Sequence, residues 1–230
     1  MKKFAPILDW LERGDHLKSL FAPETALPDT ELGGFLVLDK AIPLHETVNR
    51  KTESLASSWE SAHQYLEDCK EVIDLEDLEW LDNYEVSLIQ EELGDPPSVA
   101  YPIYLISTKA ESGSEMVVYI GKTSSKNNRF GGGHSAITKL HAPEFEGLEK
   151  RLYPACAILL TKNKCYLPLE WISPLLKAEK LLKSIEAQLI NSFKPPLNTH
   201  HINRKSSAGD PQIHIQNFAN ESQFVNGKFV

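Results

Sequence analysis

The sequence predicts an α+β fold, in which a helical N-terminal region precedes a smaller domain of strands and helices. Two observations support this class. Up to residue 98, apolar residues recur mostly at helical spacing, over 4–21, from residue 45 to 73, and over 75–93. After the turn-forming Gly94-Asp95-Pro96-Pro97, the pattern changes to strand, strand, helix, strand and helix. The chain is therefore expected to divide into an acidic helical region at 1–98, a domain at 99–200 and a polar tail at 201–230.

The helix expected from residue 45 carries a heptad seam, in which apolar or small residues alternate spacings of four and three. Its members are Val48, Thr52, Leu55, Trp59, Ala62, Leu66, Cys69 and Ile73. Such a seam buries itself either against the following helical segment, as an intramolecular hairpin, or against a second chain. The hairpin is the favoured interpretation, and self-association or a protein partner is the alternative.

The second region opens on runs rich in aromatic and β-branched residues, which are typical of strands. The expected strands cover 99–106, 116–120 and 153–160. A helix is expected over 175–193, because its apolar residues recur at helical spacing and Pro195-Pro196 follows. The tail can add short strands at 212–218 and 223–230, with a turn at Asn226-Gly227.

Composition excludes several classes of protein. Hydrophobic residues make up 41% of the 230, which suits a globular chain with a core. No apolar run approaches the roughly 18 residues of a membrane-spanning helix, and acidic residues close to the start argue against a secretory signal. The three cysteines form no metal-type pair and no even disulfide set. A cytoplasmic protein is therefore expected.

Charge is divided unevenly along the chain. Residues 1–98 hold 8 Lys/Arg and 22 Asp/Glu, whereas residues 99–230 hold 16 Lys/Arg and 10 Asp/Glu. The basic half suits a polyanionic partner, which the acidic half would repel. Solubility alone is the other explanation for the acidic helices.

Glu186 stands in the apolar arc of the expected helix 175–193. On a helical wheel it falls between Phe193 and Ile190. A carboxylate in such an arc is costly unless it is paired with a cation or binds a metal. A salt bridge at the edge of the core and a metal ligand both remain open.

A second candidate site follows the expected strand 116–120. Gly121 permits the close approach of a ligand, and Lys122 follows directly. Arg129 and His134 flank three consecutive glycines. Basic side chains beside flexible backbone suit a phosphate, although the spacing fits neither a Walker loop nor a dinucleotide fingerprint. The alternative is an ordinary strand end followed by a solvated loop.

Taken together, these residues resemble the GIY-YIG nuclease family over about residues 100–200. The motifs in order are Pro102-Ile103-Tyr104, Tyr119-Ile120-Gly121, Arg129-Phe130, His134, Glu186 and Pro196-Leu197-Asn198. The sequence departs from the family pattern at Pro102, where a glycine is usual. The spacings from Tyr104 to Tyr119 and from Arg129 to His134 are also wider than usual.

The resemblance implies a three-stranded antiparallel sheet flanked by helices, and the hydrolysis of DNA phosphodiesters. It implies a catalytic set, which consists of Tyr104, Tyr119, Lys122, Arg129, His134, Glu186 and Asn198. Tyr104 would be the general base, because a phenol of pKa ~10 becomes usable beside a cation such as Lys122 or through metal-bound water. Arg129 and Tyr119 would stabilise the phosphate, Glu186 would hold Mg²⁺ or Mn²⁺, and Asn198 would brace the site.

DNA is the expected partner, and no membrane contact is expected. The candidate contacts to the DNA backbone are Lys122, Lys126, Arg129, Lys139, Arg151, Arg204 and Lys205. Two other functions remain open. One is a catalytically inactive module that binds nucleic acid on the same scaffold, and the other is a protein-interaction module that works through residues 1–98.

Overall fold

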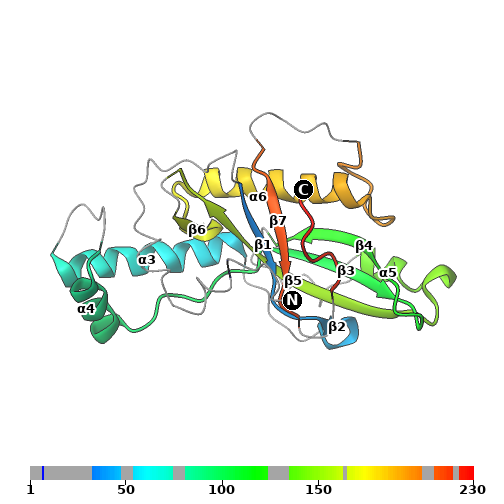
Figure 1. Ribbon diagram of the computed structural model, residues 1–230, viewed down its shortest axis with the longest axis horizontal. Coiled ribbons are helices and arrows are strands. Elements are labelled where there is room, and N and C mark those ends of the chain that lie inside the picture. Colours follow the sequence, from blue (N-terminus) through cyan, green and yellow to red (C-terminus); the bar gives the residue numbers. More distant parts are fainter. Residues whose placement is uncertain are drawn as a thin grey trace.

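Seven strands form one mixed sheet in the described part of the chain (Figure 1). The computed structural model describes residue 7 and residues 33–47, 54–74, 81–123, 135–162, 165–203, 210–219 and 223–230. The strands are β1 (Gly34–Leu38), β2 (Ile42–Pro43), β3 (Ile103–Lys109), β4 (Glu115–Lys122), β5 (Glu149–Leu160), β6 (Tyr166–Pro168) and β7 (Ile213–Asn217). The described helices are α3 (Leu55–Ile73), α4 (Asn83–Leu93), α5 (Ser135–Lys139) and α6 (Leu175–Phe193). Short 3-10 helices lie at η1 (Leu44–Thr47), η2 (Pro143–Phe145) and η3 (Leu169–Trp171).

The sheet runs in the order β4-β3-β5-β1-β7, with β2 and β6 also paired to β5. The expected antiparallel trio is present as β4-β3-β5, but the expectation of only three strands is wrong. The physical reason lies in β5, whose 12 residues outreach the seven of β3. Beyond the end of β3, the same edge of β5 pairs with β6, and the opposite edge, whose backbone groups also need partners, pairs with β1 and β2.

The expected helical character of residues 1–98 is also corrected, because β1 and β2 lie within this range. The run Phe35-Leu36-Val37-Leu38 is too short to show periodicity, yet it joins the sheet between β5 and β7. From the tail, β7 confirms the strand expected at 212–218. After a turn at 224–227, the last residues form a bridge between Phe229 and His214 and backbone hydrogen bonds to Ile213 and Ile215 of β7, but no further strand. The helix expected over 4–21 lies outside the described residues, apart from Ile7.

The helix expected from residue 45 begins instead at Leu55, with Ser54 as its N-cap, and α4 begins at a capping box between Asp82 and Glu85. Residues 44–47 form η1, and the seam positions Val48 and Thr52 lie outside the described residues. The seam residues Leu55, Ala62 and Cys69 are buried in the main core. Helix α3 packs against α4, η3 and α6 of its own chain. These seam residues therefore pack inside the chain, against more than one element.

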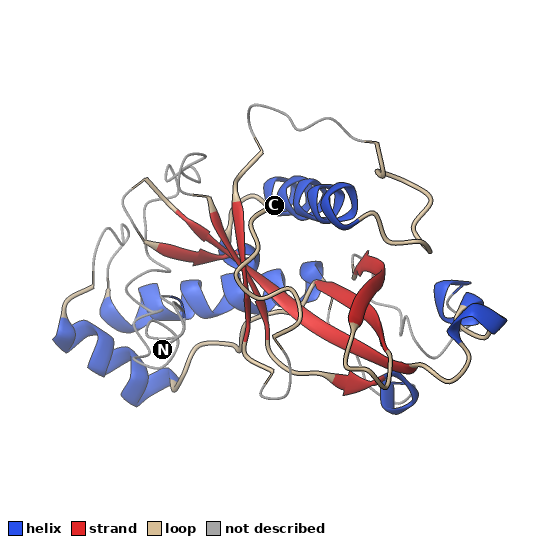
Figure 2. Cartoon of the chain, turned by 45° about the vertical axis from the view of Figure 1, so that its right-hand side comes forward, coloured by secondary structure: helices blue, strands red, loops and turns tan. Residues whose placement is uncertain are grey.

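The helix α6 has the bounds that the sequence predicted and lies along one face of the sheet (Figure 2). Its residues Leu182, Ile185 and Leu189 share the main core with strand residues such as Leu105 and Ile120. The opposite face packs in part against α5, η1 and η2, through a second cluster whose strand residues are Ile42, Tyr104, Ile106, Val118 and Leu152. No helix of the described ranges combines the length and the apolar character that crossing a membrane requires.

Candidate functional site

Two tyrosines and a glycine form one side of the site. In the β3–β4 pairing Tyr104 lies opposite Gly121, and Ile106 lies opposite Tyr119. A Cβ atom at position 121 would collide with the Tyr104 phenol oxygen and would lie 2.8 Å from the Tyr119 ring. The two ring centroids are 6.1 Å apart. Glycine is therefore required at 121, because the Tyr104 phenol occupies the space that a side chain would take.

Lys122 and Glu186 form the other side. The Lys122 ammonium lies 2.7 Å from a carboxylate oxygen of Glu186, and the two side chains are 22% and 14% exposed. This ion pair answers the question that the helical wheel raised, because the carboxylate in the apolar arc of α6 has a cation as partner. A salt bridge at the edge of the core was one of the two predicted outcomes. The pairing leaves the second, a metal ligand, as a prediction.

Asn198 holds the outer edge of β4. Its side-chain oxygen accepts a hydrogen bond from the Ile120 backbone N–H at 2.9 Å, and its amide donates to the Ile120 carbonyl at 2.8 Å. Beside it, the Leu197 N–H donates to the Val118 carbonyl at 3.1 Å. The loop after α6 thus satisfies groups that an edge strand would otherwise leave unpaired. Asn198 therefore braces β4, and its part in a catalytic site stays a prediction.

These residues approach β4 from both faces of the sheet. Ile103 and Ile120 lie on the α6 side, and so does Lys122, which pairs with Ile103. Tyr104 and Tyr119 belong to the cluster on the opposite face. β4 is the last strand in the order of the sheet, so both sets lie near the same edge. Tyr119 and Lys122 are three residues apart on one strand, a span of roughly 10 Å.

The structure describes only some of the remaining predicted site residues. Arg129, His134, Lys126, Arg204 and Lys205 lie outside the described residues. Lys139 is exposed at the end of α5.

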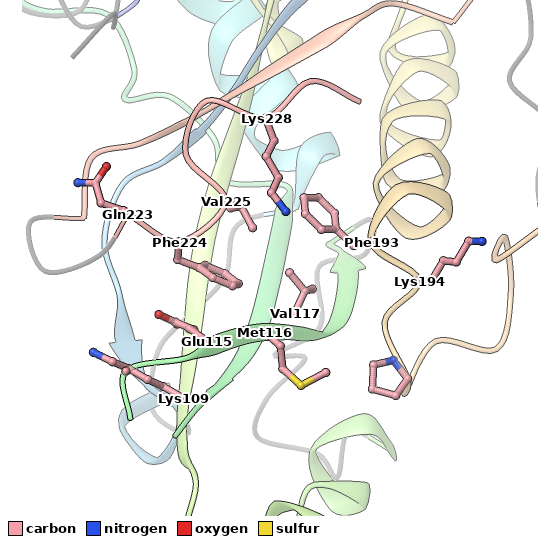
Figure 3. A pocket seen from close by; sticks show the side chains of 12 residues that line it. Lys109, Glu115, Met116, Val117, Phe193, Lys194, Gln223, Phe224, Val225 and Lys228 are labelled. Carbon is pink, nitrogen blue, oxygen red and sulfur yellow. The ribbon is translucent and has the colours of Figure 1, made fainter. Parts of the chain in front are cut away.

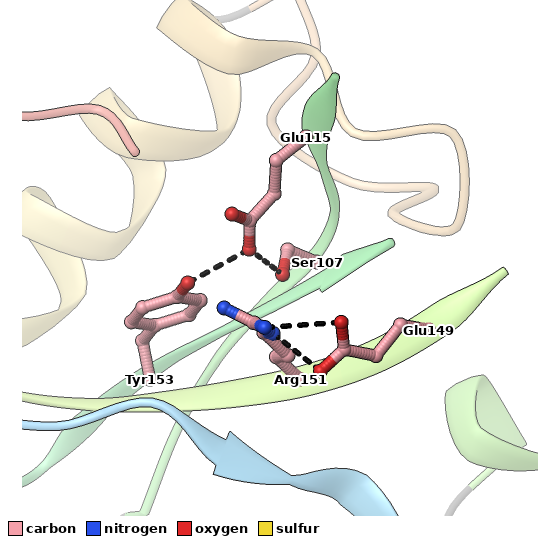
Figure 4. A network of polar contacts seen from close by, with 5 residues as sticks. All are labelled: Ser107, Glu115, Glu149, Arg151 and Tyr153. Carbon is pink, nitrogen blue, oxygen red and sulfur yellow. Dashed lines mark hydrogen bonds and ion pairs between the residues drawn. The ribbon is translucent and has the colours of Figure 1, made fainter. Parts of the chain in front are cut away.

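Arg151 is only 8% exposed and binds the Glu149 carboxylate through two hydrogen bonds, of 2.7 and 3.0 Å (Figure 4). This pairing raises the pKa of Arg151 and lowers that of Glu149. Its burial disfavours the predicted contact with DNA.

A metal ion would find one carboxylate here. Among the described residues no group of three or more His, Cys, Asp or Glu side chains lies close enough together to hold a metal. A single partly exposed carboxylate such as Glu186 still suits Mg²⁺, which usually keeps several waters and takes further oxygens from phosphate. The chemistry of the site is therefore compatible with the predicted ion.

A polar network beneath the C-terminal segment was not predicted. One oxygen of Glu115 accepts hydrogen bonds from the Ser107 hydroxyl at 2.6 Å and from the Tyr153 hydroxyl at 2.8 Å (Figure 4). Glu115 and Tyr153 are far apart in sequence and on strands that do not pair. The sequence therefore carries no signal for this contact.

Comparison with known proteins adds no further assignment. No protein-family model, curated protein or solved structure matches this chain.

Proposed function

We propose that this protein is a metal-dependent DNA endonuclease of the GIY-YIG type. The observation that carries the proposal is the geometry at β4. The Tyr104–Tyr119 pair packs around Gly121, the Lys122–Glu186 ion pair lies next along the same strand, and Asn198 binds the backbone between them. Residues that the sequence motif selects from four separate segments thus border one edge of the sheet.

In the proposed mechanism the side chains of this chain position and polarise a DNA phosphodiester. Tyr104 takes the proton of the attacking water, and Tyr119 donates a hydrogen bond to a non-bridging oxygen. Arg129 supplies a planar pair of donors to the same phosphoryl group. Tyr104 is 2% exposed, whereas Tyr119 is half-buried.

Glu186 would hold Mg²⁺ or Mn²⁺, which when bound supplies positive charge for the leaving 3′ oxygen. In the chain itself Lys122 offsets the cost of placing the Glu186 carboxylate in the apolar arc of α6. Lys122 also lies at the end of β4, where it adds a cation for the incoming phosphate.

A nucleic-acid-binding module without cleavage is the second candidate. The near-complete burial of Tyr104 and the neutralisation of Glu186 by Lys122 favour it. Such a module would bind DNA with a steep salt dependence and leave it intact.

The test compares the wild type with Glu186→Ala and Arg129→Ala on supercoiled plasmid, with and without Mg²⁺. The endonuclease proposal expects metal-dependent nicking or linearisation that both variants lose. Lys70→Gln, which removes a positive charge from the surface of α3, is the matched control and retains activity. Equal cutting by every preparation would show a contaminant. Salt-sensitive binding by the wild type without any cutting would establish the binding module instead.

A further inference from the structure

A cavity of about 590 Å³ lies beyond the C-terminal end of α6 (Figure 3). Its walls come from the β3–β4 hairpin, the residues that follow α6, and the C-terminal segment 223–230. This volume is within the range of roughly 300–1,000 Å³ that is typical of small-molecule sites. None of the predicted catalytic residues within the described ranges lines it.

The cavity adjoins the candidate nuclease site on the α6 face of the sheet. Phe193 lies two turns after Glu186 on α6, a distance of roughly 10 Å along the helix axis. Val117 lies five residues before Lys122 on β4, roughly 17 Å along the strand. Pro196, from the loop that carries Asn198, lines the cavity as well. A DNA strand bound at Glu186 would therefore reach the cavity within a few nucleotides.

The centre of the cavity is aromatic and apolar. Figure 3 shows the rings of Phe193 and Phe224 pointing toward its middle, with Val117 below the Phe193 ring. Phe224 packs on the Tyr153 ring at a centroid distance of 5.0 Å. Tyr153 is itself held by its hydrogen bond to Glu115, which also lines the cavity. One aromatic wall is thus fixed by a buried network before any ligand binds.

The rim is basic. Lys109 and Lys194 lie on opposite sides of the cavity, and Lys228 extends over the Phe193 ring at 5.1 Å from its centroid (Figure 3). Lys194 and Lys228 are exposed. The single carboxylate, Glu115, would repel a phosphate from its corner but can accept a hydrogen bond from a base amino group. The charges therefore suit a ligand with an aromatic middle and anionic ends.

We propose that this cavity binds an unpaired nucleotide of single-stranded DNA, with its base between Phe193 and Phe224 and the flanking phosphates on Lys194, Lys228 and Lys109. The assignment of the ligand to the DNA strand rests on the proposed endonuclease function. A paired base cannot enter, because its faces are covered by its neighbours in the duplex. An unpaired base exposes both faces for stacking, and the lysines neutralise the backbone on each side.

The test measures the affinity of the full chain for a labelled single-stranded oligonucleotide of about eight nucleotides by fluorescence anisotropy in EDTA. The proteins are the wild type, Lys228→Gln, Lys194→Gln and the control Lys70→Gln. Each cavity variant is expected to bind several-fold more weakly and to reduce the salt slope by about 0.7. Replacing the nucleotides by abasic sites is expected to weaken binding by the wild type about tenfold, because base stacking is lost.

Urea midpoints that match the wild type confirm that the variants are folded. The proposal is overturned if abasic and intact strands bind equally, or if Lys228→Gln and Lys70→Gln behave alike. Equal binding of a fully paired duplex of the same length also overturns it. Because EDTA prevents metal-dependent cleavage, the binding assay tests the cavity proposal alone, and plasmid nicking tests the endonuclease proposal alone. Plasmid nicking without these binding differences refutes the cavity assignment alone. These binding differences in a wild type that does not nick plasmid refute the endonuclease alone.

Discussion

Replacing Asn198 by alanine should destabilise the fold and disorder the edge of β4. Asn198 is 9% exposed, and its side chain makes two hydrogen bonds to the backbone of Ile120, at 2.8 and 2.9 Å. Each bond contributes a net of about 1 kcal/mol, and an unpaired buried group costs about 1–3 kcal/mol. The alanine variant leaves both the N–H and the carbonyl of Ile120 without this partner. We expect it to lose about 2–4 kcal/mol of unfolding free energy.

The assay is urea unfolding followed by fluorescence, with Asn203→Ala as the control. Asn203 is an exposed asparagine just beyond the same loop, and its replacement should change the unfolding free energy by less than about 0.5 kcal/mol. Asn198→Asp should be destabilised as well, because it loses the amide donor and places an oxygen against the Ile120 carbonyl. Because the brace fixes the strand between Tyr119 and Lys122, nicking by folded Asn198→Ala should fall at least about tenfold. An unfolding free energy of Asn198→Ala within about 0.5 kcal/mol of the wild type would refute the reasoning.

Three further changes have definite expected results. Gly121→Ala should lower the unfolding free energy by about 1–3 kcal/mol and abolish nicking, because its Cβ meets the Tyr104 phenol and the Tyr119 ring. The control is Gly113→Ala, whose Cβ meets no atom within 4 Å but whose φ is +85°. It should lower the unfolding free energy by about 1 kcal/mol and leave nicking intact. Burial raises the pKa of Glu170 to about 7 from 4.5, so the stability it contributes is complete below pH 4.5 and is lost as the pH rises through about 7. The unfolding free energy from urea denaturation should fall across this range by up to about 3 kcal/mol for the wild type and stay nearly level for Glu170→Gln. Parallel pH dependences for the two proteins would contradict this. The thiols of Cys69, Cys156 and Cys165 are all buried and unbridged, so Ellman's reagent should react slowly with the native chain and quickly in urea, whereas rapid native labelling would contradict the burial.

The spacing of apolar residues predicted the helix and the strands whose residues are close together in sequence. The apolar recurrence over 175–193 and the following Pro195-Pro196 gave α6 its bounds, and the strand runs at 116–120 and 153–160 lie within β4 and β5. The sheet was predicted too small, because β1 contains only the short apolar run Phe35–Leu38 after a glycine pair, and its pairing with β5 is wholly non-local. Such pairing depends on the unsatisfied backbone groups of a distant strand. A short stretch of sequence does not show which distant strand it will pair with.

The candidate site was predictable where a residue was out of place in its own element. Glu186 in an apolar arc required a partner, and the structure supplies Lys122. Gly121 after a strand indicated a close approach, and the Tyr104 phenol lies there. Arg151 looked like any basic residue in sequence, and only the structure shows that Glu149 holds it inside. The cavity beyond α6 depends on contacts between distant residues, such as Tyr153 with Glu115 and Lys228 with Phe193, so no local pattern predicted it.

The central claim is that the residues bordering the edge of β4 cleave a DNA phosphodiester. The most direct test is the single-turnover rate of plasmid nicking in Mg²⁺ by the wild type and by Glu186→Gln, which keeps the size of the side chain and removes its charge. The account predicts nicking by the wild type and a fall of at least about a hundredfold in the variant, with both proteins shown to be folded by urea unfolding. Equal rates for the two proteins would contradict it.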